Sequence, residues 1–167
     1  MGKLIRLDAL ISEDPTINTT RKFPFLLLDG LIADLTPWVK CGGHGTVSGI
    51  PNFVPVASMR LWYLLNLPVA TDTDRKEAKR IQGVLARADA AAVPGGIRAM
   101  SEYILEGFWW TLSWPFVEYA LNKLHGYGIA PRKPLLPLKE GEGEVFMDAL
   151  EEAMRLECQL TEIDSTP

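Results

Sequence analysis

Apolar positions along the first third of the chain switch between helical and strand-like spacing. Leu4, Leu7 and Ile11 recur at helical intervals. The unbroken apolar run at residues 25–28 is the pattern of a short strand buried on both faces of a parallel sheet. As a whole, the pattern predicts helix, strand, helix, strand and helix at residues 3–11, 25–28, 31–39, 46–50 and 54–67. This order is typical of an α/β fold with parallel strands.

Beyond residue 68 the apolar spacing is helical throughout. Asp-Arg-Lys-Glu at residues 74–77 resembles a capping box at a helix start, and Pro-Gly-Gly at residues 94–96 predicts the end of that helix. The following helical segment is either continuous or broken at Pro115, and one more helix precedes the C-terminus. We therefore expect a single domain over residues 1–167, in which residues 68–167 form a helical extension.

Two parallel strands alone leave unpaired backbone groups along their outer edges and need cover on both faces. The sheet must therefore be completed by another molecule. We expect either a homo-oligomer, namely a dimer of this chain, or a separate polypeptide that supplies the complementing strands.

Composition favours a soluble globular protein and excludes several classes of partner. The 167 residues are 47% hydrophobic and carry a net charge of −4. Basic residues alternate with acids, as at residues 74–80, so we expect no binding to nucleic acid or to an anionic membrane. The apolar stretch at residues 103–121 contains Glu106, Pro115 and Glu118, which argues against a membrane span. No secretory leader pattern opens the chain, and we expect a cytoplasmic protein.

The two cysteines, Cys41 and Cys158, lie far apart and have no partner motif. This arrangement favours reduced thiols, buried or half-buried, over a disulfide or a metal site. We expect neither a metal nor a cofactor.

Three segments carry a more specific pattern. They are Phe-Leu-Leu-Leu-Asp-Gly at residues 25–30, Gly-Gly-His-Gly-Thr-Val-Ser-Gly-Ile-Pro-Asn-Phe-Val-Pro at residues 42–55, and His-Gly-Tyr-Gly-Ile-Ala-Pro-Arg-Lys-Pro-Leu at residues 125–135. They resemble the last two barrel strands and the C-terminal helices of the dihydrodipicolinate synthase and N-acetylneuraminate lyase superfamily, especially its fungal 2-keto acid aldolase-like branch. The resemblance implies a partial TIM barrel of two βα units at residues 1–67. A complete barrel needs roughly 200 residues or more.

The resembled family performs aldol chemistry through a lysine that forms a Schiff base with a 2-keto acid. The resemblance implies that this chain starts just beyond that lysine, because Lys3 matches a helix position after the lysine-bearing strand. Only Gly30 and the wall at residues 47–52 match positions near the family's substrate, and Pro51 departs from the small residue expected there. The resemblance therefore implies a truncated aldolase-family protein without the Schiff-base lysine.

In such barrels the reactive groups follow the strands, whereas residues that precede a strand serve stability. Candidate catalytic residues are therefore Asp29, Ser48 and Asn52. Asp29 is either a general base or a cap of the next helix, and Asn52 either positions a substrate or shapes its turn. His44 precedes its strand, and we expect a turn histidine bonded to nearby backbone.

An apparent insertion at residues 97–115 relative to the resembled family is rich in aromatic residues. Its candidate substrate-binding side chains are Tyr103, Phe108, Trp109, Trp110 and Trp114. Dense aromatics of this kind line an apolar pocket or bury a core or subunit interface.

These observations lead to one functional hypothesis and two alternatives. The hypothesis is an enzyme, a cyclase, isomerase or lyase, that acts on a small hydrophobic molecule of specialised metabolism without a Schiff base. The first alternative is a noncatalytic half-barrel, either a pseudoenzyme or a complementing subunit. The second is a residual 2-keto acid aldolase that uses Lys40 or another lysine.

Overall fold

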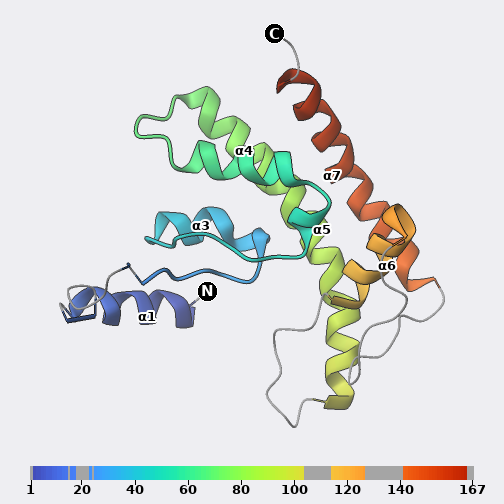
Figure 1. Cartoon of the computed structure of the whole chain (residues 1–167), viewed down its shortest axis with the longest axis horizontal. Coiled ribbons are helices and arrows are strands. Elements are labelled where there is room, and N and C mark those ends of the chain that lie inside the picture. The colour runs from blue at the N-terminus through green and yellow to red at the C-terminus, as the bar shows by residue number, and fades with distance from the viewer. Residues whose placement is uncertain are drawn as a thin grey trace.

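The structure is a computed structural model that describes residues 2–14, 16–17, 23, 25–103, 114–126 and 141–164. In this part of the chain the architecture is mostly helical (Figure 1). The elements are α1 (Gly2–Glu13), η1 (Ile32–Asp34), α3 (Leu35–Lys40), η2 (Ile50–Asn52), α4 (Pro55–Leu65), α5 (Asp72–Tyr103), α6 (Trp114–His125) and α7 (Glu142–Asp164).

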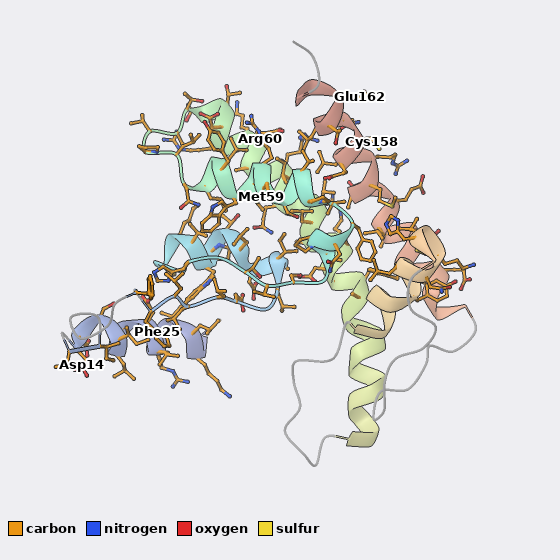
Figure 2. The ribbon with its side chains drawn as sticks, in the orientation of Figure 1. Asp14, Phe25, Met59, Arg60, Cys158 and Glu162 are labelled. Atoms are coloured by element: carbon orange, nitrogen blue, oxygen red, sulfur yellow. The ribbon has the colours of Figure 1, made fainter. Side chains whose placement is uncertain are left out.

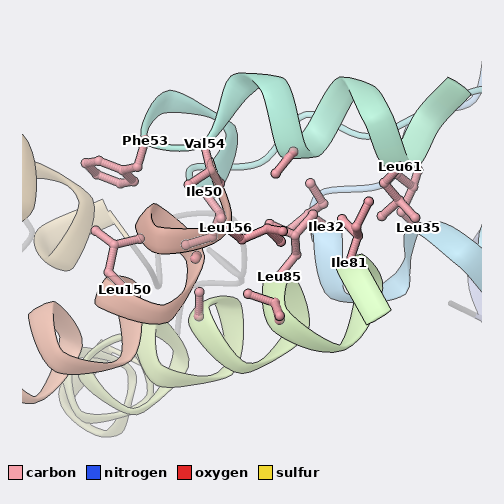
Figure 3. Packing of buried hydrophobic residues seen from close by; sticks show 14 of the residues in the cluster. Ile32, Leu35, Ile50, Phe53, Val54, Leu61, Ile81, Leu85, Leu150 and Leu156 are labelled. Carbon is pink, nitrogen blue, oxygen red and sulfur yellow. The ribbon is translucent and has the colours of Figure 1, made fainter. Parts of the chain in front are cut away.

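The main core forms where α4, α6 and α7 pack against the long helix α5 (Figure 1). Its fully buried side chains come from segments far apart in the sequence, as Figure 3 shows for Ile32, Leu61, Ile81, Leu85 and Leu150. Phe53 and Phe146 meet edge to face, with their ring centroids 6.3 Å apart. The core therefore joins the turns of the first third of the chain to the C-terminal helices.

Helix α5 continues past the Pro-Gly-Gly segment at residues 94–96, so the break predicted there is wrong. A proline within a helix removes one backbone hydrogen bond, and it does not by itself end the helix. Twenty-two residues of α5 precede Pro94, and their buried face, including Ile81, Leu85 and Ala88, packs in the main core. Once a helix is nucleated and packed, each further residue adds one bond, so the helix extends through an unfavourable segment. Pro115 lies at the start of α6, where proline is tolerated.

The two predicted strands do not form a ladder in the part of the chain that the structure describes. The two segments meet at a single parallel bridge between Asp29 and Thr46. Asp29 N–H donates to the Gly45 carbonyl at 3.0 Å, and Val47 N–H donates to the Asp29 carbonyl at 2.8 Å. The parallel direction expected for an α/β fold is present, but a partial barrel is not established by the described residues.

Residues 25–29 alternate in burial, so the prediction of a segment buried on both faces is wrong. Leu27 and Asp29 are buried, at 6% and 8% exposed, whereas Leu26 and Leu28 are 55% and 42% exposed. Alternation of this kind is expected for an extended segment packed on one face only. Ile11 and Trp38 pack against one side of the segment, whereas the leucine side chains on the other side stay exposed.

A second, smaller core lies under this segment. Ile11 of α1, Leu27 and Trp38 of α3 form its buried centre, and Phe25 packs against it beside α1 (Figure 2). Gly43 lies flat on the Trp38 indole, because a Cβ at this position would collide with the ring. The Trp38 Nε1 atom is buried and has no hydrogen-bond partner among the described residues.

Both cysteines are free, as predicted, but they are exposed and not buried. Cys41 follows α3, and Cys158 lies on α7 (Figure 2). Among the helices that the structure describes, none combines the length and the apolar character that a bilayer crossing requires.

Candidate functional site

The candidate site is the turn that follows the first extended segment, and Asp29 lies at its start. The Asp29 Oδ1 atom accepts a hydrogen bond from Gly30 N–H at 2.8 Å. Its Oδ2 atom is buried and has no hydrogen-bond partner in the described part of the chain. The Asp29 carbonyl also accepts a bond from the Thr46 hydroxyl at 3.0 Å. The backbone of Asp29 is therefore fixed to the second segment, while half of its carboxyl group stays unsatisfied.

The helix-capping role considered for Asp29 is carried instead by Asp89 of α5. Leu31, the residue before η1, makes no side-chain cap. Ala33 N–H donates to the Asp89 Oδ2 atom at 3.0 Å. A carboxylate that accepts the free N–H groups at a helix start stabilises that end. The cap therefore comes from 56 residues further along the chain.

Gln82, two helical turns before Asp89 on α5, fastens the same region. Its Oε1 atom accepts bonds from Thr36 N–H at 2.9 Å and from the Thr36 hydroxyl at 2.6 Å. Its Nε2 atom donates to the Ile32 carbonyl at 2.9 Å and to the Ala33 carbonyl at 3.2 Å. Two polar side chains of α5 thus hold η1 and the start of α3.

Asp89 is a buried acid in an acidic environment. It is 2% exposed. Burial raises the pKa of its carboxyl group, and the negative charges of Asp34 and Asp29 raise it further. The hydrogen bonds from the Ala33 and Ile32 backbone act in the opposite direction on this pKa and do not cancel the effect. Asp89 was not among the sequence candidates.

The other predicted rim residues are arranged less closely. Val47 is bonded to Asp29 through the backbone, but its side chain is 69% exposed. Gly30 and Ser48 are half-buried. Asn52 is exposed, and its Nδ2 atom donates to the Gly49 carbonyl at 2.9 Å, which closes its own turn. The structure brings Gly30 and Val47 next to Asp29, whereas the hydrogen bonds given for Asn52 in the described residues go to Gly49.

His44 is bonded to backbone, as predicted, but to another segment. Its Nδ1 atom accepts a hydrogen bond from Leu27 N–H at 3.2 Å, and its own N–H donates to the Leu27 carbonyl at 3.1 Å. The imidazole thus takes the place of the carbonyl that a regular parallel ladder would supply. This role requires Nδ1 to carry no proton.

The predicted aromatic site lies outside the part of the chain whose side chains are described. Phe108, Trp109 and Trp110 are outside the described residues altogether. Tyr103 ends α5 and Trp114 begins α6, and their side chains are not described. Their predicted role in substrate binding remains a prediction.

Every lysine in the described ranges is exposed, including Lys3 on α1 and Lys40 at the end of α3. A lysine that forms a Schiff base efficiently is usually buried or placed near another cation, which lowers its pKa. Among the same residues, no group of three or more histidine, cysteine, aspartate or glutamate side chains is arranged to hold a metal ion.

Comparison with known proteins returns fungal aldolases. A probable mitochondrial 4-hydroxy-2-oxoglutarate aldolase of Emericella nidulans is 30% identical over 119 residues, which are 71% of this chain and 31% of that protein. L-threo-3-deoxy-hexylosonate aldolases of Aspergillus niger and Hypocrea jecorina are each 27% identical, over 179 and 165 residues. These matches cover 97% and 95% of this chain but 46% and 43% of the relatives.

The chain therefore spans less than half the length of these curated relatives. No protein-family profile matches it, and no solved structure does. The matches confirm the resemblance predicted from the sequence: the chain is similar, over part of their length, to fungal 2-keto-3-deoxy acid aldolases of the dihydrodipicolinate synthase and N-acetylneuraminate lyase superfamily.

Proposed function

We propose that this chain is a noncatalytic, aldolase-like half-barrel subunit that completes its sheet by pairing with a second copy of itself. The observation that carries the proposal is a group of exposed apolar side chains on one face of the extended segments. Leu26, Leu28 and Val47 are 55%, 42% and 69% exposed on these segments. Exposed apolar side chains grouped in this way favour an interaction surface.

The backbone edge beside this face is also unpaired. The N–H and C=O groups of Leu27 and Asp29 are directed at the second segment. Those of Leu26 and Leu28 alternate to the opposite edge, and no hydrogen bond engages them in the described part of the chain. An edge strand without charged or proline residues is a template for pairing with another strand.

A second copy is the occupant that this edge fits. In a two-fold dimer the same strand edge lies on both sides of the axis, so residues 25–28 of one copy would pair with those of the other. The segment carries no charge that would repel its own copy. In such a pairing the Leu26 and Leu28 side chains of one copy would lie beside those of the other on the same face.

The described chemistry supports a noncatalytic role. The lysines in these ranges are exposed, and the free carboxyl oxygen of Asp29 is inaccessible to solvent. Nucleophilic or acid–base catalysis needs a group within reach of a bound substrate. The arrangement therefore favours a structural subunit over a residual aldolase.

A catalytic role on a hydrophobic molecule is the second candidate. It is favoured by the position of Asp29 between exposed apolar neighbours, since Leu28 precedes it and Val47 is bonded to its carbonyl. In that case the apolar face would bind the substrate, and opening of the turn would expose the carboxyl group.

Mass measurement in solution tests the proposal. We expect the purified chain to be a dimer by light scattering, with an interface larger than roughly 2,000 Å², as in obligate dimers. The double variant Leu26→Lys/Leu28→Lys should be monomeric and keep its helical circular dichroism spectrum. Val69→Lys, a change at a side chain that is 86% exposed between α4 and α5, is the matched control and should remain dimeric.

A monomeric wild-type chain would contradict the proposal. A borohydride treatment in the presence of pyruvate separates the residual aldolase from the other two candidates. We expect no change in protein mass, and a stoichiometric adduct on one lysine would establish Schiff-base chemistry instead.

A further inference from the structure

The imidazole of His44 takes a backbone position between the two extended segments. Its Nδ1 atom accepts the Leu27 N–H at 3.2 Å, and the His44 N–H donates to the Leu27 carbonyl at 3.1 Å. Both polar backbone groups of Leu27 are therefore bonded to one histidine. Leu27 is 6% exposed, so water has little access to its N–H if the imidazole no longer accepts.

The spacing of the backbone bonds explains why a side chain is needed there. The Leu27 carbonyl accepts from His44. The Asp29 carbonyl, two residues on, accepts from Val47, which lies three residues beyond His44. One extra residue of this kind interrupts a regular ladder. The chain just before His44 is also held elsewhere, because the Gly43 N–H donates to a carbonyl of α3 at 2.9 Å.

The hydrogen bond depends on the protonation state of the ring. A neutral imidazole accepts at Nδ1 only when its proton is on Nε2, and an imidazolium has a proton on both nitrogens and accepts at neither. Histidine ordinarily gains this second proton as the pH falls through about 6.5. His44 is exposed, so solvent can protonate its ring directly. Protonation would therefore set two N–H groups against each other where the structure has a hydrogen bond.

The titratable and charged groups on the elements around His44 carry both signs of charge. They are Asp8 of α1, Asp29 of the first segment, Lys40 and Cys41 at the end of α3, and Arg60 of α4. The Asp8 Oδ2 atom lies 3.4 Å from the position that a Cβ of Gly42 would take. A carboxylate favours a charged imidazole and a cation disfavours it. The acceptor that the described residues give the Leu27 N–H is nevertheless the His44 ring.

We infer that His44 is a pH-sensitive switch between the two extended segments: its neutral ring binds Leu27, and its protonation releases the segment at residues 25–28 from the second segment. The stabilisation is present above the pH range in which an unfolded histidine titrates, and it is lost as the pH falls through that range. The bonds concerned lie on the edge that faces the second segment, so this inference does not depend on dimer formation.

Amide exchange of the full chain, measured by NMR at about pH 5 and about pH 7.5, tests the switch. The protection factor of the wild-type Leu27 amide, which corrects for the intrinsic pH dependence of exchange, should be about fivefold lower at the lower pH, the contribution of one hydrogen bond. His44→Asn keeps an acceptor that does not titrate, so its Leu27 protection should be equal at both pH values. His125→Asn, at the other histidine of the chain, is the matched control and should keep the wild-type pH dependence.

The ring nitrogens of the wild type give a second readout that needs no variant. Nitrogen-15 spectra should show the His44 Nδ1 atom without a proton at the higher pH, and the Leu27 amide proton should shift along the titration curve of the His44 ring. A neutral ring with its proton on Nδ1, or a Leu27 amide that does not follow the titration, would overturn the inference. A pH dependence that persists in His44→Asn would overturn it as well.

Discussion

At the scale of single residues, Gly43 has no room for a side chain. A Cβ at this position would collide with the Trp38 ring, whereas a Cβ at Gly83 on α5 would meet only the flexible end of Arg87 at 3.6 Å. We expect Gly43→Ala to lower the free energy of unfolding by about 1–3 kcal/mol, the usual cost of overpacking. Gly83→Ala, the control, should raise it by about 0.5–1 kcal/mol, because alanine favours helix. Urea denaturation measures both, and equal effects would contradict the close packing on Trp38.

The residues of the site were only partly predictable from the sequence. The backbone bond of His44 was predicted, because a histidine between glycines ahead of a strand favours a structural role. Asp89 and Gln82 were not predicted as site residues. Each directly follows a residue of the buried apolar stripe, Ala88 and Ile81 respectively, and a polar residue in that position usually belongs to the solvent-facing side of the helix. Their seven-residue spacing places both on one helix face, and this was the available signal. Which turn they bind depends on long-range packing and could not be predicted.

At the scale of elements, a side chain of α7 caps the N-terminus of α4. Helix α4 begins at Pro55 without a side-chain cap from Val54. The Glu157 carboxylate accepts the Val56 and Ala57 N–H groups, each at 2.8 Å, from about 100 residues away. A carboxylate at a helix start satisfies free N–H groups and interacts favourably with the helix dipole. These two hydrogen bonds therefore both join α4 to α7 and stabilise the N-terminus of α4.

Glu157→Ala should lower the free energy of unfolding by about 1.5–3 kcal/mol, the range for hydrogen bonds to a charged group. Glu157→Gln should cost less, because its amide oxygen still accepts one bond. Glu151→Ala removes an exposed ion pair with Arg155 at 3.6 Å and should change stability by less than about 1 kcal/mol. Thermal and urea unfolding test the order of the three variants, and a Glu157→Ala protein as stable as Glu151→Ala would show that the bond does not hold α4.

Element types were more predictable than their ends. Helical spacing predicted α1, α4 and α7, whose apolar stripes are strong. The segment at residues 25–28 was predicted to be a strand buried on both faces, because a run such as Phe-Leu-Leu-Leu gives no sign of which side chains are exposed. The pattern also could not show that α5 continues past Pro94, since that depends on how firmly the preceding turns are packed.

At the scale of the whole molecule, the described residues form two apolar clusters of unequal size. The main core joins α4, α5, α6 and α7, whereas α1 contributes a single buried residue, Ile11, to the small cluster around Trp38. Regions with few buried apolar contacts open at lower free energy than the rest of a fold. We expect the amides of α1 to exchange with deuterium well before those in the buried turns of α4 and α7. Hydrogen-exchange mass spectrometry measures this, and equal protection would show that both clusters unfold together.

Gln82 and Asp89, the two side chains of α5 that bind η1 and the start of α3, limit insertions and deletions in α5 during evolution. Gln82 and Asp89 reach the same turn because seven residues make nearly two helical turns. One residue inserted or deleted between them would rotate Asp89 by about 100° around the helix axis, away from Ala33. The connection between α4 and α5 at residues 68–70 has no such register to keep, because Pro68 and Val69 are exposed. Related sequences should therefore vary in length at residues 68–70 and keep a constant length from residue 82 to residue 89.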